Sequence, residues 1–117
     1  MDKITIWHNP RCSKSRDSFR LLEEKNLEFE VVKYLDRVPT EDELQNMLVM
    51  LGMESARGLM RTKEEIYKEL NLAEESSEEK LIEAMLKNPR LIERPIVIKG
   101  NRAAIGRPIE NIIKLLD

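Results

Sequence analysis

The fold of this 117-residue chain is decided by residues 3–34, which read KITIWHNPRCSKSRDSFRLLEEKNLEFEVVKY. Residues 3–8 alternate isoleucine with more polar side chains, which predicts a strand, and Asn9-Pro10 ends it. Residues 13–25 favour a helix, and residues 29–34 are typical of a second strand. A strand, a helix and a strand of this length form a βαβ unit, so the two strands are predicted to be parallel, with a right-handed crossover.

The middle of the chain is predicted to be helical. Thr40 with Glu43 forms a capping box that opens a helix through about Leu51, and Gly52 ends it. Further helical pieces are expected over residues 55–60 and 63–70. Ser76 with Glu79 is interpreted as a second capping box, opening a helix that ends at Asn88-Pro89.

The C-terminal part predicts a hairpin followed by a helix. Residues 96–98 and 103–105 are apolar and flank a Gly100-Asn101 turn. Pro108 suits the first position of a last helix. The apolar face of that helix is expected at helical spacing, over Ile109, Ile112, Ile113 and Leu116. The element order predicts an α/β fold, a mixed four-stranded sheet with helices packed on it.

Length and composition indicate one domain spanning residues 1–117. The apolar fraction of 41% supports a core, and the single cysteine excludes an internal disulfide, zinc ribbons and Fe–S ferredoxins. The formal net charge of −2 argues against a nucleic-acid binder, and no apolar run suits a membrane span or a signal peptide. We expect a soluble cytoplasmic protein, a monomer by default, with no metal and no bound cofactor.

The charges are unevenly distributed along the chain. Residues 10–20 carry a net +3 and residues 87–107 a net +5, whereas residues 64–83 carry a net −6. The acidic stretch is interpreted as a solvated surface. The two basic stretches surround the cysteine and the last strands, where positive charge favours an anion.

Cys12 is the candidate nucleophile, because it lies between the first strand and the helix that follows it. The unpaired N–H groups and the positive dipole end of that helix stabilise a thiolate and lower its pKa. A cationic His8 would add to this effect, and the hydroxyls of Ser13 or Ser15 are potential donors to the sulfur. The alternative is an inert cysteine that packs under the sheet as a small apolar residue.

A second indication of a reactive site is the dipeptide Arg94-Pro95, which lies immediately before a predicted strand. A proline at this corner is often cis and lies beside a reactive cysteine, and the alternative is a trans proline that starts an edge strand. Arg107 is expected to lie directly before the last helix. Arginines that converge on one thiolate would form an oxyanion pocket, although each alone is typical of a protein surface.

The chain resembles the glutaredoxin-dependent arsenate reductases in several motifs that follow in the same order and cover nearly its whole length. The first is HNPRCSKSR at residues 8–16, which matches the His-Asn-Pro-x-Cys-x-x-Ser-Arg signature of that family. The others are LMR at 59–61, ERPIV at 93–97 and GRP at 106–108. The resemblance implies a thioredoxin-like fold with a helical insertion.

The resemblance also implies roles for individual residues. Cys12 matches the nucleophile that attacks arsenate, His8 the histidine associated with a low thiol pKa, and Ser15 a residue that hydrogen-bonds the cysteine. The expected oxyanion-binding residues and the cis-proline are Arg61, Arg94, Arg107 and Pro95. The chain departs from the best-characterised members at Ser13-Lys14, where those carry small uncharged residues.

The implied reaction reduces arsenate to arsenite, with glutathione as co-substrate and glutaredoxin as the reductant of the resulting mixed disulfide. A lone cysteine fits this scheme, because it cannot resolve its own intermediate through an internal disulfide. Three alternatives remain: a different oxyanion, a thiol oxidoreductase acting on glutathionylated proteins, and an RNA polymerase-binding regulator of the same fold. The regulators use a Cys-x-x-Cys switch, whereas this chain has Cys12 and Ser15 at those positions.

Overall fold

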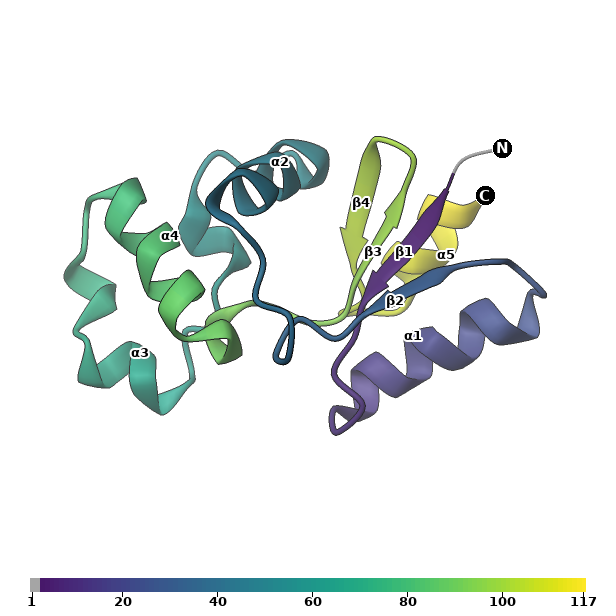
Figure 1. Cartoon of the computed structure of the whole chain (residues 1–117), viewed down its shortest axis with the longest axis horizontal. Helices are drawn as coiled ribbons and strands as arrows, with labels where there is room; N and C mark the ends of the chain where they lie inside the picture. Colours follow the sequence, from purple (N-terminus) through teal and green to yellow (C-terminus); the bar gives the residue numbers. More distant parts are fainter. Residues whose placement is uncertain (1–2) are drawn as a thin grey trace. The chain divides into compact units, whose positions relative to one another are not determined.

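The computed structural model describes residues 3–117, which form two compact units (Figure 1). The sheet unit comprises residues 3–37 and 94–117, and the helical unit is Val38–Glu93. The helical unit follows the second strand and precedes the third, so the expected helical insertion in the middle of the chain is confirmed. No helix within residues 3–117 has both the length and the apolar character needed to cross a membrane.

The sheet unit is built on a mixed four-stranded sheet with strand order β2-β1-β3-β4 (Figure 1). As predicted, β1 pairs with β2 in parallel, and it pairs with β3 antiparallel. The hairpin of β3 and β4 is also confirmed, and Gly100 adopts a φ of 63° in its turn. The elements of this unit are β1 (Ile4–Trp7), α1 (Ser13–Glu24), β2 (Glu30–Val32), β3 (Ile96–Lys99), β4 (Arg102–Ile105) and α5 (Glu110–Leu116).

The core of the sheet unit lies against one face of the sheet. Ile6 and its register partner Val97 are fully buried on that face. Leu22 of α1 and Ile112 of α5 belong to the same apolar cluster, so both helices cover this face. This packing fixes the start of α1, and therefore Cys12, relative to the strand that precedes it.

The helical unit has its own apolar core. It contains α2 (Glu41–Leu51), α3 (Glu65–Glu69) and α4 (Glu78–Lys87), with short 3-10 turns η1 (Ala56–Leu59), η2 (Leu72–Glu74) and η3 (Pro89–Leu91). Arg57 of η1 links this turn to η2 and α3, because its guanidinium donates to the carbonyl oxygen of Leu72 at 2.8 Å and to the Tyr67 hydroxyl. The fully buried side chains include Leu44, Met47, Leu59, Met85, Leu91 and Ile92.

The first predicted capping box is confirmed in both of its hydrogen bonds. The Thr40 hydroxyl accepts the Glu43 N–H at 3.2 Å, and the Glu43 carboxylate accepts the Thr40 N–H at 3.1 Å. Gly52 ends α2 with a φ of 70°, a conformation that costs an L side chain more than glycine. Asn88 caps the end of α4, also as predicted.

The second predicted capping box is wrong. The N-cap of α4 is Ser77, whose hydroxyl accepts the Lys80 N–H at 3.4 Å, and not Ser76. The Glu75 carboxylate accepts the Ser77 N–H at 3.1 Å. The helix therefore begins one residue later than predicted. Both serines are favourable cap residues, and this local hydrogen bond from Glu75 accompanies the choice of Ser77.

The predicted start of the last helix is also wrong. Helix α5 begins at Glu110 with Ile109 as its N-cap, so Pro108 lies before the helix and Arg107 does not precede it directly. The buried positions are Ile112 and Leu115, while Ile113 is 37% exposed. The buried face of α5 therefore runs through Ile112 and Leu115 and not through Ile113.

Gly106 lies at a crowded corner of the sheet unit. A Cβ at this residue would lie 2.6 Å from Ser18 Oγ and 2.7 Å from Pro95 Cγ. Its N–H donates to the Pro95 carbonyl oxygen at 2.9 Å. A glycine is therefore required where the chain after β4 passes α1 and the start of β3.

Gly106→Ala is expected to lower the free energy of unfolding by about 1–3 kcal/mol, because the new methyl group overpacks a rigid corner. The matched control is Gly58→Ala, whose Cβ would meet only the flexible side chain of Met53, at 3.3 Å. That control is expected to change stability by less than about 0.5 kcal/mol. Chemical denaturation of both variants measures the difference, and equal losses would show that Gly106 is not sterically constrained.

Candidate active site

The loop between β1 and α1 is a short, hydrogen-bonded turn that presents Cys12. The His8 N–H donates to the Val32 carbonyl oxygen at 2.8 Å, which extends the pairing of β1 with β2. The Cys12 N–H donates to the Asn9 carbonyl oxygen at 3.0 Å, and the Arg11 N–H donates to Asn9 Oδ1 at 3.0 Å. Asn9 thus shapes the turn with its backbone and its side chain.

Asn9 is not among the site residues predicted from the sequence, although it positions the loop. Asn9 is 8% exposed, and its own N–H donates to Ser15 Oγ at 3.0 Å. The available signal was its place before a proline, since asparagine commonly organises turns through its side chain. The sequence alone identifies Asn9-Pro10 as the end of a strand and as part of the family motif.

His8 and Ser15 are joined by a buried hydrogen bond of 2.7 Å between Nδ1 and Oγ. His8 is 7% exposed and stacks on Phe19 with ring centroids 4.9 Å apart. Burial lowers the pKa of His8, and the positive charge of Lys33 lowers it further. Near pH 7 the imidazole is therefore neutral, and it acts on this loop through a hydrogen bond rather than through a positive charge.

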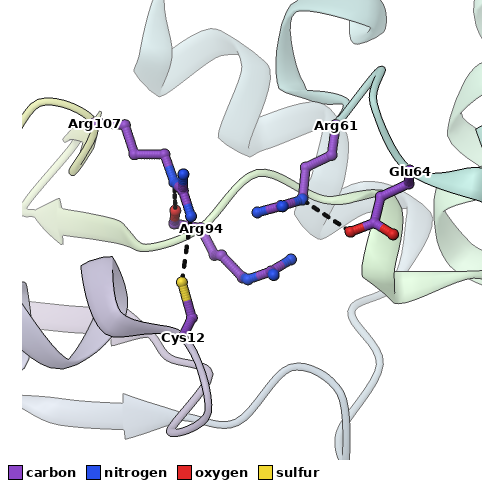
Figure 2. Close-up of polar contacts among 5 residues, drawn as sticks. All are labelled: Cys12, Arg61, Glu64, Arg94 and Arg107. Carbon is purple, nitrogen blue, oxygen red and sulfur yellow. Dashed lines mark hydrogen bonds and ion pairs between the residues drawn. The ribbon is translucent and has the colours of Figure 1, made fainter.

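The sulfur of Cys12 is held against a guanidinium. Cys12 is the N-cap residue of α1 and is 8% exposed. Arg107 Nη2 donates to Cys12 Sγ at 3.3 Å, while Arg107 Nε donates to the Arg94 carbonyl oxygen at 2.9 Å (Figure 2). The second hydrogen bond orients the guanidinium, so a planar fork meets the thiol in a fixed position.

The pKa of Cys12 is the balance of opposing effects. Burial raises the pKa of the thiol, but hydrogen bonds from the Ser15 backbone N–H, Arg94 and Arg107 lower it, as does the charge of Arg94. The net result is a pKa below the ordinary value for cysteine. Ionisation therefore stabilises the fold above the unfolded thiol pKa of about 8.5, and this contribution is lost as the pH falls through the folded pKa.

Arg94, Pro95 and Arg107 come together in the sheet unit. The Arg94–Pro95 and Arg107–Pro108 peptide bonds are both cis. Arg94 and Arg107 both act on the Cys12 sulfur, so the structure brings these two predicted arginines together with the predicted nucleophile. The arrangement provides a nucleophile beside two fixed cations, which suits attack on a small anion.

Arg61 lies in the helical unit. Its N–H donates to the Leu91 carbonyl oxygen at 2.7 Å, next to a short antiparallel bridge between Met60 and Ile92. Its side chain forms an ion pair with Glu64, with 3.1 Å between Nε and Oε1 (Figure 2).

Within residues 3–117, no group of three or more His, Cys, Asp or Glu side chains is arranged to hold a metal ion.

Comparisons with known proteins agree with this geometry. A sequence model described as the ArsC family matches residues 7–115. The chain belongs to the ArsC family. It is 53% identical over 115 residues to the Escherichia coli K12 protein YfgD, covering 97% of each chain. It is 50% identical over 117 residues to a protein of Neisseria meningitidis serogroup A named arsenate reductase, covering 99% of this chain and 100% of that one.

A solved structure is also similar to this chain over nearly its whole length. The arsenate reductase of Vibrio cholerae superposes with a TM-score of 0.93 at 44% identity, and 97% of each chain is covered. The expected α/β, thioredoxin-like fold of the ArsC chain is thereby confirmed.

For this ArsC chain we expect Cys12 to titrate below a free thiol, and Arg107→Gln to raise its pKa, because the variant removes a charged hydrogen bond to the sulfur. A hydrogen bond to a charged group is typically worth ~1.5 kcal/mol or more. The thiolate absorbance measured against pH reports both values. Arg20→Gln, at an exposed position on α1, is the matched control and should leave the midpoint unchanged. A wild-type midpoint equal to that of free cysteine would contradict the assignment.

His8 is the only histidine in the chain, so its titration is one imidazole signal in the NMR spectrum. We expect a midpoint below 6.5, because burial and Lys33 both disfavour the cation. Lys33→Gln should raise the midpoint while leaving it below 6.5, since burial is the larger cause. Lys25→Gln, a charge change beyond the other end of α1, is the control. A midpoint above 6.5 in the wild type would show that the imidazole is stabilised as a cation.

Proposed function

We propose that this protein reduces arsenate to arsenite, with Cys12 as the nucleophile and with glutathione and glutaredoxin as external reductants. The observation that carries the proposal is the contact of Arg107 Nη2 with the Cys12 sulfur at 3.3 Å in an ArsC-family chain with a single cysteine. The relative from Neisseria meningitidis and the structure from Vibrio cholerae are both named arsenate reductase, which supports arsenate as the oxyanion.

Arg94, Arg107 and Arg61 are proposed to hold the oxyanion. Guanidiniums neutralise an anion that would otherwise repel the approaching thiolate, and they bind its oxygens as planar forks. Two of the three already act on the sulfur that would form the bond to arsenic. Pro95 is proposed as a structural residue of the site, because its carbonyl oxygen accepts the N–H of Gly106, the residue before Arg107.

His8 and Ser15 are proposed to act by positioning the loop. The 2.7 Å hydrogen bond between them joins the end of β1 to the first turn of α1. The backbone N–H of Ser15 then stabilises the Cys12 thiolate. A neutral imidazole is sufficient for this function, since it serves as a hydrogen-bond partner and not as a counter-ion.

The first step forms a bond without changing the oxidation state of arsenic. The Cys12 thiolate attacks arsenic, one oxygen ligand takes up a proton and leaves as water, and a thioester of As(V) remains on the enzyme. A glutathione thiolate then attacks the Cys12 sulfur. The S–S bond forms as the S–As bond breaks, and the electron pair passes to arsenic, which leaves as arsenite.

The second glutathione-linked step regenerates the enzyme. Cys12 is left in a mixed disulfide with glutathione, and no second cysteine exists in the chain to resolve it. A glutaredoxin thiolate attacks the glutathione sulfur and releases the Cys12 thiolate. We place this cycle in the cytoplasm, where glutathione keeps thiols reduced, with a monomeric protein that needs no bound cofactor.

Arsenite formation is expected only when glutathione and glutaredoxin are both present, and Cys12→Ser should reduce it to the uncatalysed background. Arg107→Lys keeps the charge but cannot contact both the sulfur and the Arg94 carbonyl oxygen, so we expect kcat/KM to fall on the order of 100-fold. Arg20→Lys is the control. The assay measures arsenite directly by a chromatographic method.

Two outcomes would count against this function. Turnover sustained by thioredoxin alone would contradict the proposed route of reduction. A wild-type protein that forms no arsenite, while its thiolate titrates as expected, would show that the pocket serves a different oxyanion.

A further inference from the structure

The first turn of α1 has an unusual charge. The other four α-helices within residues 3–117 each carry at least one acidic residue in the first turn, and α1 has none. It instead carries Lys14 at its second position and Arg16 two residues later, with Arg11 just before the helix. Cations at the positive end of a helix dipole oppose helix stability. Local folding therefore does not account for these three charges.

These three residues, here named the basic rim, carry unneutralised charges. Arg11, Lys14 and Arg16 are all exposed, and no ion pair involves them among the residues that the structure describes. Arg16 donates only to a backbone oxygen, that of Pro10, at 3.2 Å. Such a set of charges attracts anions from solution, and salt screens the attraction.

The basic rim is distinct from the guanidiniums that act on the sulfur. Arg94 and Arg107 reach Cys12 from the segments before β3 and after β4. The rim instead comes from the loop and the first turn that carry Cys12 itself. A ligand bound to the inner arginines would leave the rim exposed for a second anion.

We propose that the basic rim docks the carboxylates of the external thiol, so that its sulfur meets Cys12. This inference rests on the proposed function, in which glutathione is that thiol. Glutathione bears two carboxylates and one ammonium group, so it approaches as an anion. The rim selects an anionic thiol over a neutral one by raising its local concentration and rate of encounter.

The test is a disulfide-exchange reaction that needs no arsenate. Cys12 thiolate attacks a disulfide, a mixed disulfide forms, and the other half leaves as a thiolate. Two probes are compared at one pH: glutathione disulfide, which is anionic, and bis(2-hydroxyethyl) disulfide, which is neutral. Any change in the thiolate fraction of a variant affects both rates equally, so the ratio of the two second-order rate constants isolates the charge effect.

The variant Arg11→Gln/Lys14→Gln/Arg16→Gln is expected to lower this ratio on the order of 10-fold at low salt. The wild-type ratio should also fall as sodium chloride is raised, toward the value of the variant. Arg20→Gln is the matched control, because it removes one exposed cation of the same helix that lies about 12 Å along the axis from Cys12 and about 6 Å beyond Arg16. Its ratio should stay at the wild-type value. The triple variant removes unfavourable charges from the start of α1, so it is expected to fold, and chemical denaturation verifies this.

An unchanged ratio in the triple variant, or an equal fall in Arg20→Gln, would overturn the docking surface. The result is independent of the proposed reaction. Arsenite formation without a rim effect would reject the rim alone. A rim effect without arsenite formation would support the rim and reject arsenate as the substrate.

Discussion

The contact between a buried sulfur and a guanidinium is the interaction on which the site depends. A thiol that is 8% exposed would resist ionisation, because burial disfavours the thiolate. The Ser15 N–H, Arg94 and Arg107 reverse that preference. The Arg107 hydrogen bond to the sulfur requires the chain after β4 to pass close to α1, and Gly106 permits this, since a Cβ there would lie 2.6 Å from Ser18 Oγ. The close approach at Gly106 therefore affects both the packing against α1 and the contact of Arg107 with the Cys12 sulfur.

The loop before α1 makes a second contribution, through hydrogen bonds rather than charge. Asn9 accepts two backbone N–H groups, and Ser15 Oγ bonds both His8 and the Asn9 N–H. This network orders the turn, so the Ser15 N–H is directed at the sulfur without a flexible side chain in between. A backbone donor needs little reorganisation when the thiolate forms, which suits the role of nucleophile proposed for Cys12.

Much of this fold is predictable from local patterns, because its signals are local. Alternation in residues 3–8, the Thr40–Glu43 box and the Gly100 turn each depend on neighbours in sequence, and the structure confirms them. The error at the start of α4 occurs where a side-chain hydrogen bond outside the predicted capping motif decides. The Glu75 carboxylate selects Ser77 as the cap of α4. The site residues follow the same division: motifs nominate Cys12 and the arginines, but only tertiary structure shows that His8 is buried beside Ser15 and therefore neutral.

A net charge of −2 conceals two kinds of positive charge around one cysteine. Arg107 is oriented by the Arg94 carbonyl oxygen, and its effect on the sulfur depends on geometry, so lysine is a poor substitute. Lys14 and its exposed neighbours have no such constraint, and their effect depends on distance and salt. The inner cations lower the pKa of the thiol, and the outer ones are proposed to influence which molecules reach it. In the proposed cycle a chain with a single cysteine needs both, because its second electron donor would have to arrive from solution at the same sulfur.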